Sequence, residues 1–126
     1  MHQENVIVGL IQMAVGPDPV ENLKKAAARV EQAAKDGAQI ICLPELYRTH
    51  YFPQGIGVNT SSLAETIPGE STNAFSEIAL QHTVVIIVPL YEQSTIGRFY
   101  NSAVIIDADG TLHTPYHKVH IPQDPG

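Results

Sequence analysis

The sequence predicts an α/β fold in which helices pack on a largely parallel sheet that ends in a hairpin. Three apolar runs have the length and the β-branched content of buried strands and are too short for globular helices. Two stretches begin with helix-start residues, and an Asp-Gly turn at Asp109 separates two more strand-like stretches. We therefore expect the order strand, helix, strand, long loop, helix, strand and hairpin.

The first strand and helix are predicted from local signals. Residues 6–13 are apolar and rich in β-branched side chains. Asp18 is a typical N-cap, Pro19 suits the first helical position, and Glu21 follows the cap by three residues. Apolar residues then recur at spacings of three and four until Gly37. This pattern predicts an amphipathic helix that packs a small-residue face on a flat surface.

The second predicted strand, residues 38–43, ends before Pro44, which cannot donate to a sheet. The segment from Glu45 to about Pro68 has no sustained period, so we expect a long loop there, and such loops in compact domains are usually functional. The remaining predicted elements are a helix opened by Gly69 with Phe75, Ile78 and Ala79 on one face, a third buried strand at residues 83–90, and hairpin strands at residues 100–107 and 112–116.

Composition argues against several classes of protein. The 126 residues carry 13 acidic and 7 basic side chains, a formal charge of −6, which argues against a nucleic-acid partner. No apolar run approaches the roughly 20 residues that a membrane-spanning helix needs, and the N-terminus lacks the pattern of an export signal. The single cysteine, Cys42, cannot form an intramolecular disulfide. We expect one cytoplasmic domain with no membrane contact.

Glu45 is the first candidate for chemistry, because it lies just beyond the second predicted strand, where open α/β sheets place their sites. It could act as a general base, or it could be an ordinary solvated carboxylate of a loop. Tyr47, Tyr51 and Phe52 follow it in a chain with only 6% aromatic residues. They could wall a small-molecule pocket or simply anchor the loop. Tyr51 and Phe52 are the predicted substrate-binding residues.

Lys118 is the second candidate. Alternation places it on the same face as Tyr116 and His120, and a lysine held near a reacting centre can stabilise an oxyanion. The alternative is a surface cluster of cations. No HExxH or Cys/His spacing accompanies His117 and His120, so we expect no metal. If Glu45 and Lys118 share a site, their charged groups should lie roughly 4–6 Å apart.

Cys42 is predicted to be a buried, inert core thiol rather than a nucleophile, because it lies within an apolar strand. Alternation along that strand would also place it on the opposite face from Glu45. The sequence contains no GxSxG, P-loop or dinucleotide-binding motif. Serine hydrolysis and nucleotide binding therefore have no support.

Eight short motifs, taken in this order and spacing, resemble the nitrilase (carbon-nitrogen hydrolase) superfamily over the whole chain. They are Val8-Gly9-Leu10-Ile11-Gln12-Met13, Asn22-Leu23, Gly37-Ala38, Leu43-Pro44-Glu45-Leu46, Ile67-Pro68-Gly69, Tyr100-Asn101-Ser102-Ala103, Asp107-Ala108-Asp109-Gly110 and His117-Lys118-Val119-His120-Ile121-Pro122. The stretch ending in His-Ile-Pro-x-Asp-Pro-Gly is most similar to the N-carbamoylputrescine amidase and N-carbamoyl amino acid amidohydrolase branches.

The resemblance implies a Cys-Glu-Lys hydrolase with an α-β-β-α sandwich. It implies that Glu45 is the general base that activates the thiol, and that Lys118 stabilises the tetrahedral intermediate. In the family the nucleophilic cysteine lies well downstream of this lysine, and Cys42 does not match its position. His117 stands where an arginine is more usual. The resemblance therefore predicts that residues 1–126 are only the N-terminal part of a carbon-nitrogen hydrolase domain, an incomplete sandwich.

Two functions follow from these expectations. The first is hydrolysis of non-peptide C–N bonds in a small-molecule linear amide or N-carbamoyl amine, with no cofactor. Without the thiol, residues 1–126 alone should show no turnover, so whether this chain by itself is an enzyme stays open. The alternative is a catalytically inactive stand-alone half that acts as a binding or interaction module. We expect a homo-oligomer, or a chain that needs its missing C-terminal half, because part of the sheet would be uncovered.

Overall fold

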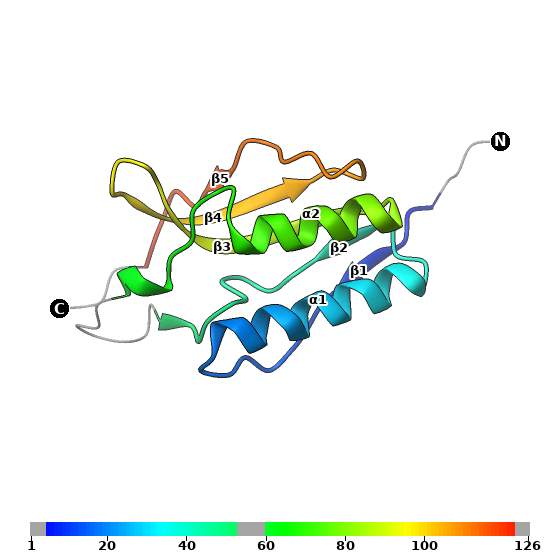
Figure 1. Cartoon of the computed structure of the whole chain (residues 1–126), viewed down its shortest axis with the longest axis horizontal. Helices are drawn as coiled ribbons and strands as arrows, with labels where there is room; N and C mark the ends of the chain where they lie inside the picture. Colours follow the sequence, from blue (N-terminus) through cyan, green and yellow to red (C-terminus); the bar gives the residue numbers. More distant parts are fainter. Residues whose placement is uncertain (1–4, 53–59, 123–126) are drawn as a thin grey trace.

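The computed structural model describes residues 5–52 and 60–122, which form one mixed sheet with two helices packed on it (Figure 1). In chain order the elements are β1 (Val8–Leu10), α1 (Pro19–Lys35), β2 (Ile40–Cys42), the 3-10 helix η2 (Ser61–Leu63), α2 (Glu70–His82), β3 (Val85–Gln93), β4 (Phe99–Ile106) and β5 (Tyr116–His117). The sheet order is β1-β2-β3-β4-β5. The first three strands are parallel, and β4 and β5 are added antiparallel. The predicted α/β fold is confirmed.

The helix α1 begins and ends at the residues that the sequence predicts. Asp18 Oδ1 accepts a hydrogen bond from Val20 N–H at 2.9 Å, and Pro19 is the first helical residue. Gly37, just after the helix, has a φ of +101°, a conformation that glycine adopts without a steric penalty. Local capping therefore fixes both ends of α1.

The predicted small-residue face of α1 does pack on the sheet. Ala26 and Val30 are fully buried, and a Cβ added at Gly9 of β1 would lie 3.3 Å from the Cβ of Ala33. Such a close approach of helix and strand needs small residues on both sides. On α2 the predicted face is likewise buried, with Phe75 fully enclosed.

The predicted strands at residues 6–13 and 38–43 are shorter in the structure, where regular pairing covers only β1 and β2. Beyond the two strands the pairing continues through single backbone bonds: Ile11 N–H donates to Cys42 O at 2.9 Å. Pro44, which lacks an N–H, and the turn after it take the chain away from the sheet. Thr83 has a left-handed φ of 54° that ends α2, so the third strand starts at Val85 rather than at residue 83.

Two hairpins follow, of which the sequence predicts only the second. In the first, β3 and β4 pair along their length through a turn in which Ser94 N–H donates to Arg98 O at 2.8 Å. In the second, at the predicted Asp-Gly turn, Asp107 N–H donates to Thr111 O at 2.8 Å. The returning stretch, predicted as a strand at residues 112–116, makes one isolated bridge and then pairs regularly only as β5.

The two faces of the sheet differ in cover. Helix α1 packs on β1 and β2, and α2 packs on β3 and β4 (Figure 1). The side chains on this face are buried: Ile41, Ile86, Val88, Leu90, Val104 and Ile106. Alternate residues of the same strands point to the other face, hereafter the open face, where Leu10 is 78% and Ile105 46% exposed. Within the described residues, no helix has the length and apolar character to cross a membrane.

Candidate functional site

Glu45 and Lys118 form an ion pair at one edge of the sheet. Lys118 Nζ lies 2.8 Å from Glu45 Oε1, closer than the separation expected from the sequence. Glu45 follows β2 by three residues and Lys118 follows β5 directly. Because β4 reverses the chain direction and β5 reverses it again, β5 runs parallel to β2, and both strands end at the same edge. Open α/β sheets bind their ligands at this edge.

Asn101 is a third member of this cluster, and the sequence analysis assigned it no role. It lies on β4, and its Nδ2 donates to Glu45 Oε1 at 2.8 Å. The ammonium of Lys118 donates to the same oxygen. Among the described residues, none donates to the other carboxylate oxygen, Oε2. Both protein donors thus hold one oxygen of Glu45 and leave the second available.

The ionisation of the pair follows from these contacts. The hydrogen bond from Lys118, followed by that from Asn101, lowers the pKa of Glu45, and partial burial opposes them. The hydrogen bond to Glu45 in turn raises the pKa of Lys118. At neutral pH the site therefore contains a carboxylate and an ammonium ion.

The turn that carries Glu45 is fixed by the residues that follow it. Leu46 is buried and has a left-handed φ of 49°. Tyr47 is fully buried, donates or accepts a 2.5 Å hydrogen bond with Ser71 Oγ, and meets Phe75 edge-on at 5.7 Å. Burial raises the pKa of Tyr47. Of the two roles considered for Tyr47, anchoring is the one that the structure supports.

Arg48 and Asn22 hold the far end of the same turn. Arg48 forms an ion pair with Glu65 at 2.7 Å and a second one with Glu70. The buried Asn22 side chain donates from Nδ2 to Arg48 O at 2.8 Å and to Gly16 O at 2.8 Å. A cavity of about 490 Å³ lies beside Arg48, but the guanidinium is already paired with two carboxylates. This network supports the Glu45 turn rather than forming a second anion site.

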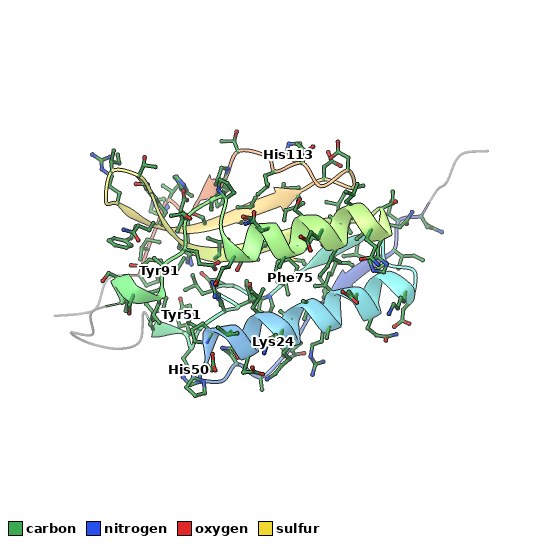
Figure 2. All side chains as sticks on the ribbon, in the orientation of Figure 1. Lys24, His50, Tyr51, Phe75, Tyr91 and His113 are labelled. Atoms are coloured by element: carbon green, nitrogen blue, oxygen red, sulfur yellow. The ribbon has the colours of Figure 1, made fainter. Side chains whose placement is uncertain are left out.

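Tyr51 and Phe52 line a cavity of about 310 Å³ next to the charged cluster. Figure 2 places Tyr51 and Tyr91 at the same end of the molecule. Leu46, which directly follows Glu45, lines the same cavity. Glu45 and Lys118 line a neighbouring cavity of about 380 Å³ together with Tyr116. The expected grouping of Lys118 with Tyr116 is therefore found, whereas His120 is not among the residues that line this cavity.

His117 points away from Lys118, toward the helix side of the sheet. Its Nε2 lies 2.8 Å from Glu92 Oε2, and its ring stacks on Tyr100 at 3.9 Å. Ser102 Oγ donates to the same oxygen of Glu92 at 2.6 Å. His117 thus holds β5 on β4 and so fixes the start of the Lys118 segment. No group of three metal-ligating side chains occurs among residues 5–52 and 60–122.

The prediction of a buried core thiol at Cys42 is wrong in one respect. Cys42 is only half-buried, because it alternates with the buried Ile41 and so lies on the open face. Its Sγ lies 3.4 Å from Leu43 O. Burial nevertheless raises the pKa of the thiol, the opposite of what activates a cysteine nucleophile.

Comparison with known proteins identifies the family. The carbon-nitrogen hydrolase profile matches residues 7–126. Omega-amidase NIT2-B from Xenopus laevis is 36% identical over 118 residues, which cover 90% of this chain and 40% of that protein. A citrullinase from Francisella tularensis is 33% identical over 123 residues, 97% of this chain and 43% of that protein.

Solved structures agree with this assignment. The crystal structure of a carbon-nitrogen hydrolase from Helicobacter pylori G27 superposes with a TM-score of 0.83 at 31% identity, covering 93% of this chain and 40% of that chain. An amidase from Nesterenkonia sp., at 22% identity and a TM-score of 0.74, shares the fold. The chain thus spans about two fifths of the length of these relatives, which agrees with the expectation of a partial domain. This chain belongs to the carbon-nitrogen hydrolase family of the nitrilase superfamily.

Proposed function

We propose that this chain is the N-terminal part of an amidase that hydrolyses the C–N bond of linear amides or N-carbamoyl amines. The single observation that carries the proposal is the contact of Glu45 Oε1 with both Lys118 and Asn101, each at 2.8 Å. In this proposal Glu45 is the general base, Lys118 stabilises the oxyanion, and Asn101 orients the carboxylate.

The geometry gives each group a distinct task. Because the two donors occupy Oε1, Oε2 is the oxygen that would take the proton of a cysteine thiol as the sulfur attacks the carbonyl carbon. The new oxyanion would draw the ammonium of Lys118 away from Glu45, which makes the carboxylate more basic as the proton arrives. When the C–N bond breaks, the leaving nitrogen takes that proton from Glu45. Water then hydrolyses the thioester, or the thiocarbamate when an N-carbamoyl amine is the substrate.

The names of the relatives support a small-molecule substrate. They are omega-amidase and citrullinase, whereas the last motif of the sequence is most similar to N-carbamoylputrescine and N-carbamoyl amino acid hydrolases. We keep those two N-carbamoyl classes as the finer proposal. We also propose that the protein is cytoplasmic. We further propose that it assembles into a homo-oligomer or with a C-terminal half, and the uncovered apolar side chains of the open face support this assembly.

The test is an assay of ammonia release by the protein made from the natural reading frame that contains residues 1–126. Amides and N-carbamoyl amines serve as substrates. We expect Glu45→Gln and Lys118→Met each to lower kcat/KM by at least about 10³-fold, as is usual for members of one catalytic unit. The matched controls are Glu21→Gln and Lys24→Met, which remove an exposed Glu-Lys pair, and they should leave activity unchanged. Full activity of Glu45→Gln would contradict the proposal.

Cys42→Ala provides a second check in the same assay. Its half-buried thiol has a raised pKa, so we expect activity to be retained. Loss of activity in Cys42→Ala alone, in a folded protein, would identify Cys42 as the nucleophile and contradict this assignment.

A further inference from the structure

Two mostly buried carboxylates lie on neighbouring backbone segments on the helix side of the sheet. Glu65, between η2 and α2, forms an isolated parallel bridge with Glu92 of β3. Glu65 N–H donates to Tyr91 O at 2.8 Å, and Gln93 N–H donates to Glu65 O at 2.7 Å. Partners across such a bridge lie about 4.8 Å apart and point to the same face. We call the pair Glu65 and Glu92 the carboxylate bridge; their side chains are 8% and 11% exposed.

The Glu65 end of the carboxylate bridge is tied to the turn that carries Glu45. Its Oε1 forms a 2.7 Å ion pair with Arg48, three residues after Glu45. Ser71 donates to both oxygens, from its N–H at 2.9 Å and from its hydroxyl at 2.8 Å. Tyr47, from the same turn as Arg48, makes a 2.5 Å hydrogen bond with the Ser71 hydroxyl. Two side chains of the Glu45 turn are therefore held by this carboxylate, one directly and one through α2.

The Glu92 end is tied in the same way to the segment that carries Lys118. Oε2 of Glu92 lies 2.8 Å from Nε2 of His117, the residue before Lys118. The Ser102 hydroxyl donates to the same oxygen at 2.6 Å. His117 is also the backbone partner of Ser102 where β5 pairs with β4. This carboxylate therefore holds the strand from which Lys118 leaves the sheet.

The candidate ion pair does not fix its own geometry. The side chains of Glu45 and Lys118 are 45% and 35% exposed, and ion pairs at such exposure contribute little stabilisation. Their 2.8 Å separation therefore depends on where the backbone places the two residues. A displacement of about 1 Å at a reacting centre can cost on the order of 10²-fold in rate. A device that fixes both backbone segments at once would thus control the site.

We propose that the carboxylate bridge is this device: Glu65 and Glu92 are positioning residues that together set the separation of Glu45 and Lys118. The inference rests on the proposed amidase function, which gives the ion pair its catalytic task. Neither carboxylate contacts the pair, and both act through the basic residue next to it in the chain. Because the two carboxylates are joined by backbone hydrogen bonds, a change at either end should disturb the same contact.

The titration of Glu45 reports this role with a sign that charge alone does not produce. Glu65→Gln and Glu92→Gln each remove a negative charge, which by itself would lower the pKa of Glu45. The hydrogen bonds from Lys118 and Asn101 hold this pKa below its ordinary value. Misalignment weakens those bonds and raises the pKa. A rise therefore identifies a change of position rather than a change of field.

The experiment uses the protein from the natural reading frame and measures the Glu45 titration by carboxyl ¹³C NMR, together with kcat and KM. The Glu45 signal is identified by its loss in Glu45→Gln. We expect Glu65→Gln and Glu92→Gln each to raise the pKa of Glu45. Each should lower kcat about tenfold or more and change KM less than about threefold. Glu77→Gln is the matched control, because it removes an exposed carboxylate of α2 outside the carboxylate bridge, and it should leave all three quantities unchanged.

The same measurements can overturn the proposal. An unchanged or lowered pKa of Glu45 in either bridge variant, in a folded protein, would do so, as would a loss that appears in KM rather than in kcat. A similar rise in Glu70→Gln would also do so, because Glu70 pairs with Arg48 from outside the carboxylate bridge and is exposed.

Two further points keep the test decisive. If Glu65→Gln does not fold, Arg48→Lys replaces it, because lysine keeps the charge but lacks the planar fork that reaches both Glu65 and Glu70. It should raise the pKa of Glu45, and an unchanged value would overturn the proposal. If the amidase proposal itself fails, no substrate is turned over, and the titration still decides whether the carboxylate bridge positions the pair.

Discussion

The two faces of the sheet are made by the same strands and have opposite properties. Toward the helices, Ile86, Val88 and Val104 are fully buried. On the open face, their neighbours in sequence are half-buried or exposed, as Ile105 is. Period-two alternation therefore divides each strand between a face that stabilises the fold and a face that carries the candidate chemistry.

The contrast also describes a site that is open on one side within the described residues. Glu45, Lys118 and Asn101 meet over the open face, where no described element of this chain packs against the sheet. A site in an enclosed pocket would need a second wall there. The chain spans about two fifths of its relatives' length, and in our proposal the remaining part of such a protein supplies that wall.

The largest expected effect concerns this uncovered face. Val8, Leu10 and Ile105 are exposed apolar side chains of this face, and burying several hundred Å² of such surface is worth on the order of 10 kcal/mol before the cost of association. We expect residues 1–126 made alone to associate or aggregate, as measured by size-exclusion chromatography with light scattering. Leu10→Glu with Ile105→Glu should shift the chain toward monomer. A monomer of 13.7 kDa with a cooperative melt before any substitution would contradict this expectation.

The next effect compares the faces directly. Ile86→Ala removes methyl groups from the enclosed core and should lower the free energy of unfolding by about 2–5 kcal/mol. Ile105 lies on the open face and is 46% exposed, so Ile105→Ala should change the free energy of unfolding by about 0.5 kcal/mol or less. Urea denaturation in a background that carries Leu10→Glu and keeps Ile105 measures the losses for both substitutions. Similar losses for both faces would show that the open face is covered within this chain.

Local signals in the sequence predict one part of this architecture well. Asp18, Pro19 and Gly37 define α1 because capping depends on residues adjacent in the chain. The hairpin between β3 and β4 is not predicted, because its turn contains Gly97 preceded by Ile96 rather than the Asn-Gly or Asp-Gly pair that signals a two-residue turn. A hairpin is thus predicted from the sequence only where its turn contains a recognisable pair of turn residues.

The candidate site likewise contains residues that the sequence predicts and residues that it does not. Glu45 and Lys118 are found from short motifs and from their position after strands. The role of Asn101 depends on a contact across 56 positions of sequence, and the cavity lined by Tyr51 and Phe52 needs Tyr91 of β3 to meet the ring of Phe52 from the distant loop. Such contacts follow from strand register, which periodicity alone does not give.

A smaller effect tests whether the contact between His117 and Glu92, on the helix side of the sheet, positions the segment that carries Lys118. His117 and Ser102 both bond Glu92, whose side chain is only 11% exposed. His117→Leu removes one partner of a mostly buried carboxylate and should cost about 1–3 kcal/mol of unfolding free energy. His117→Arg keeps a donor at this position and should cost less. Equal losses for the two variants would show that packing on Tyr100, rather than the bond to Glu92, is what matters.

The smallest effect is a shift of the Glu45 titration, which sharpens the account of the open face. Lys118 and then Asn101 lower the pKa of this carboxyl, so Lys118→Met should raise it most and Asn101→Leu should raise it less. Because the pKa is lowered by folding, the contribution of Glu45 to stability is present above the ordinary carboxyl pKa. It is lost as the pH falls through the lowered value.

Carboxyl ¹³C NMR of Glu45 as a function of pH measures this shift directly. Tyr116→Phe is the control, because Tyr116 lines the same cavity and donates no hydrogen bond to Glu45. If Asn101→Leu left the Glu45 titration where it is in the unsubstituted chain, the amide would not be holding the carboxylate. The proposed choice of Oε2 as the proton acceptor would then lose its basis, since it depends on two donors occupying Oε1.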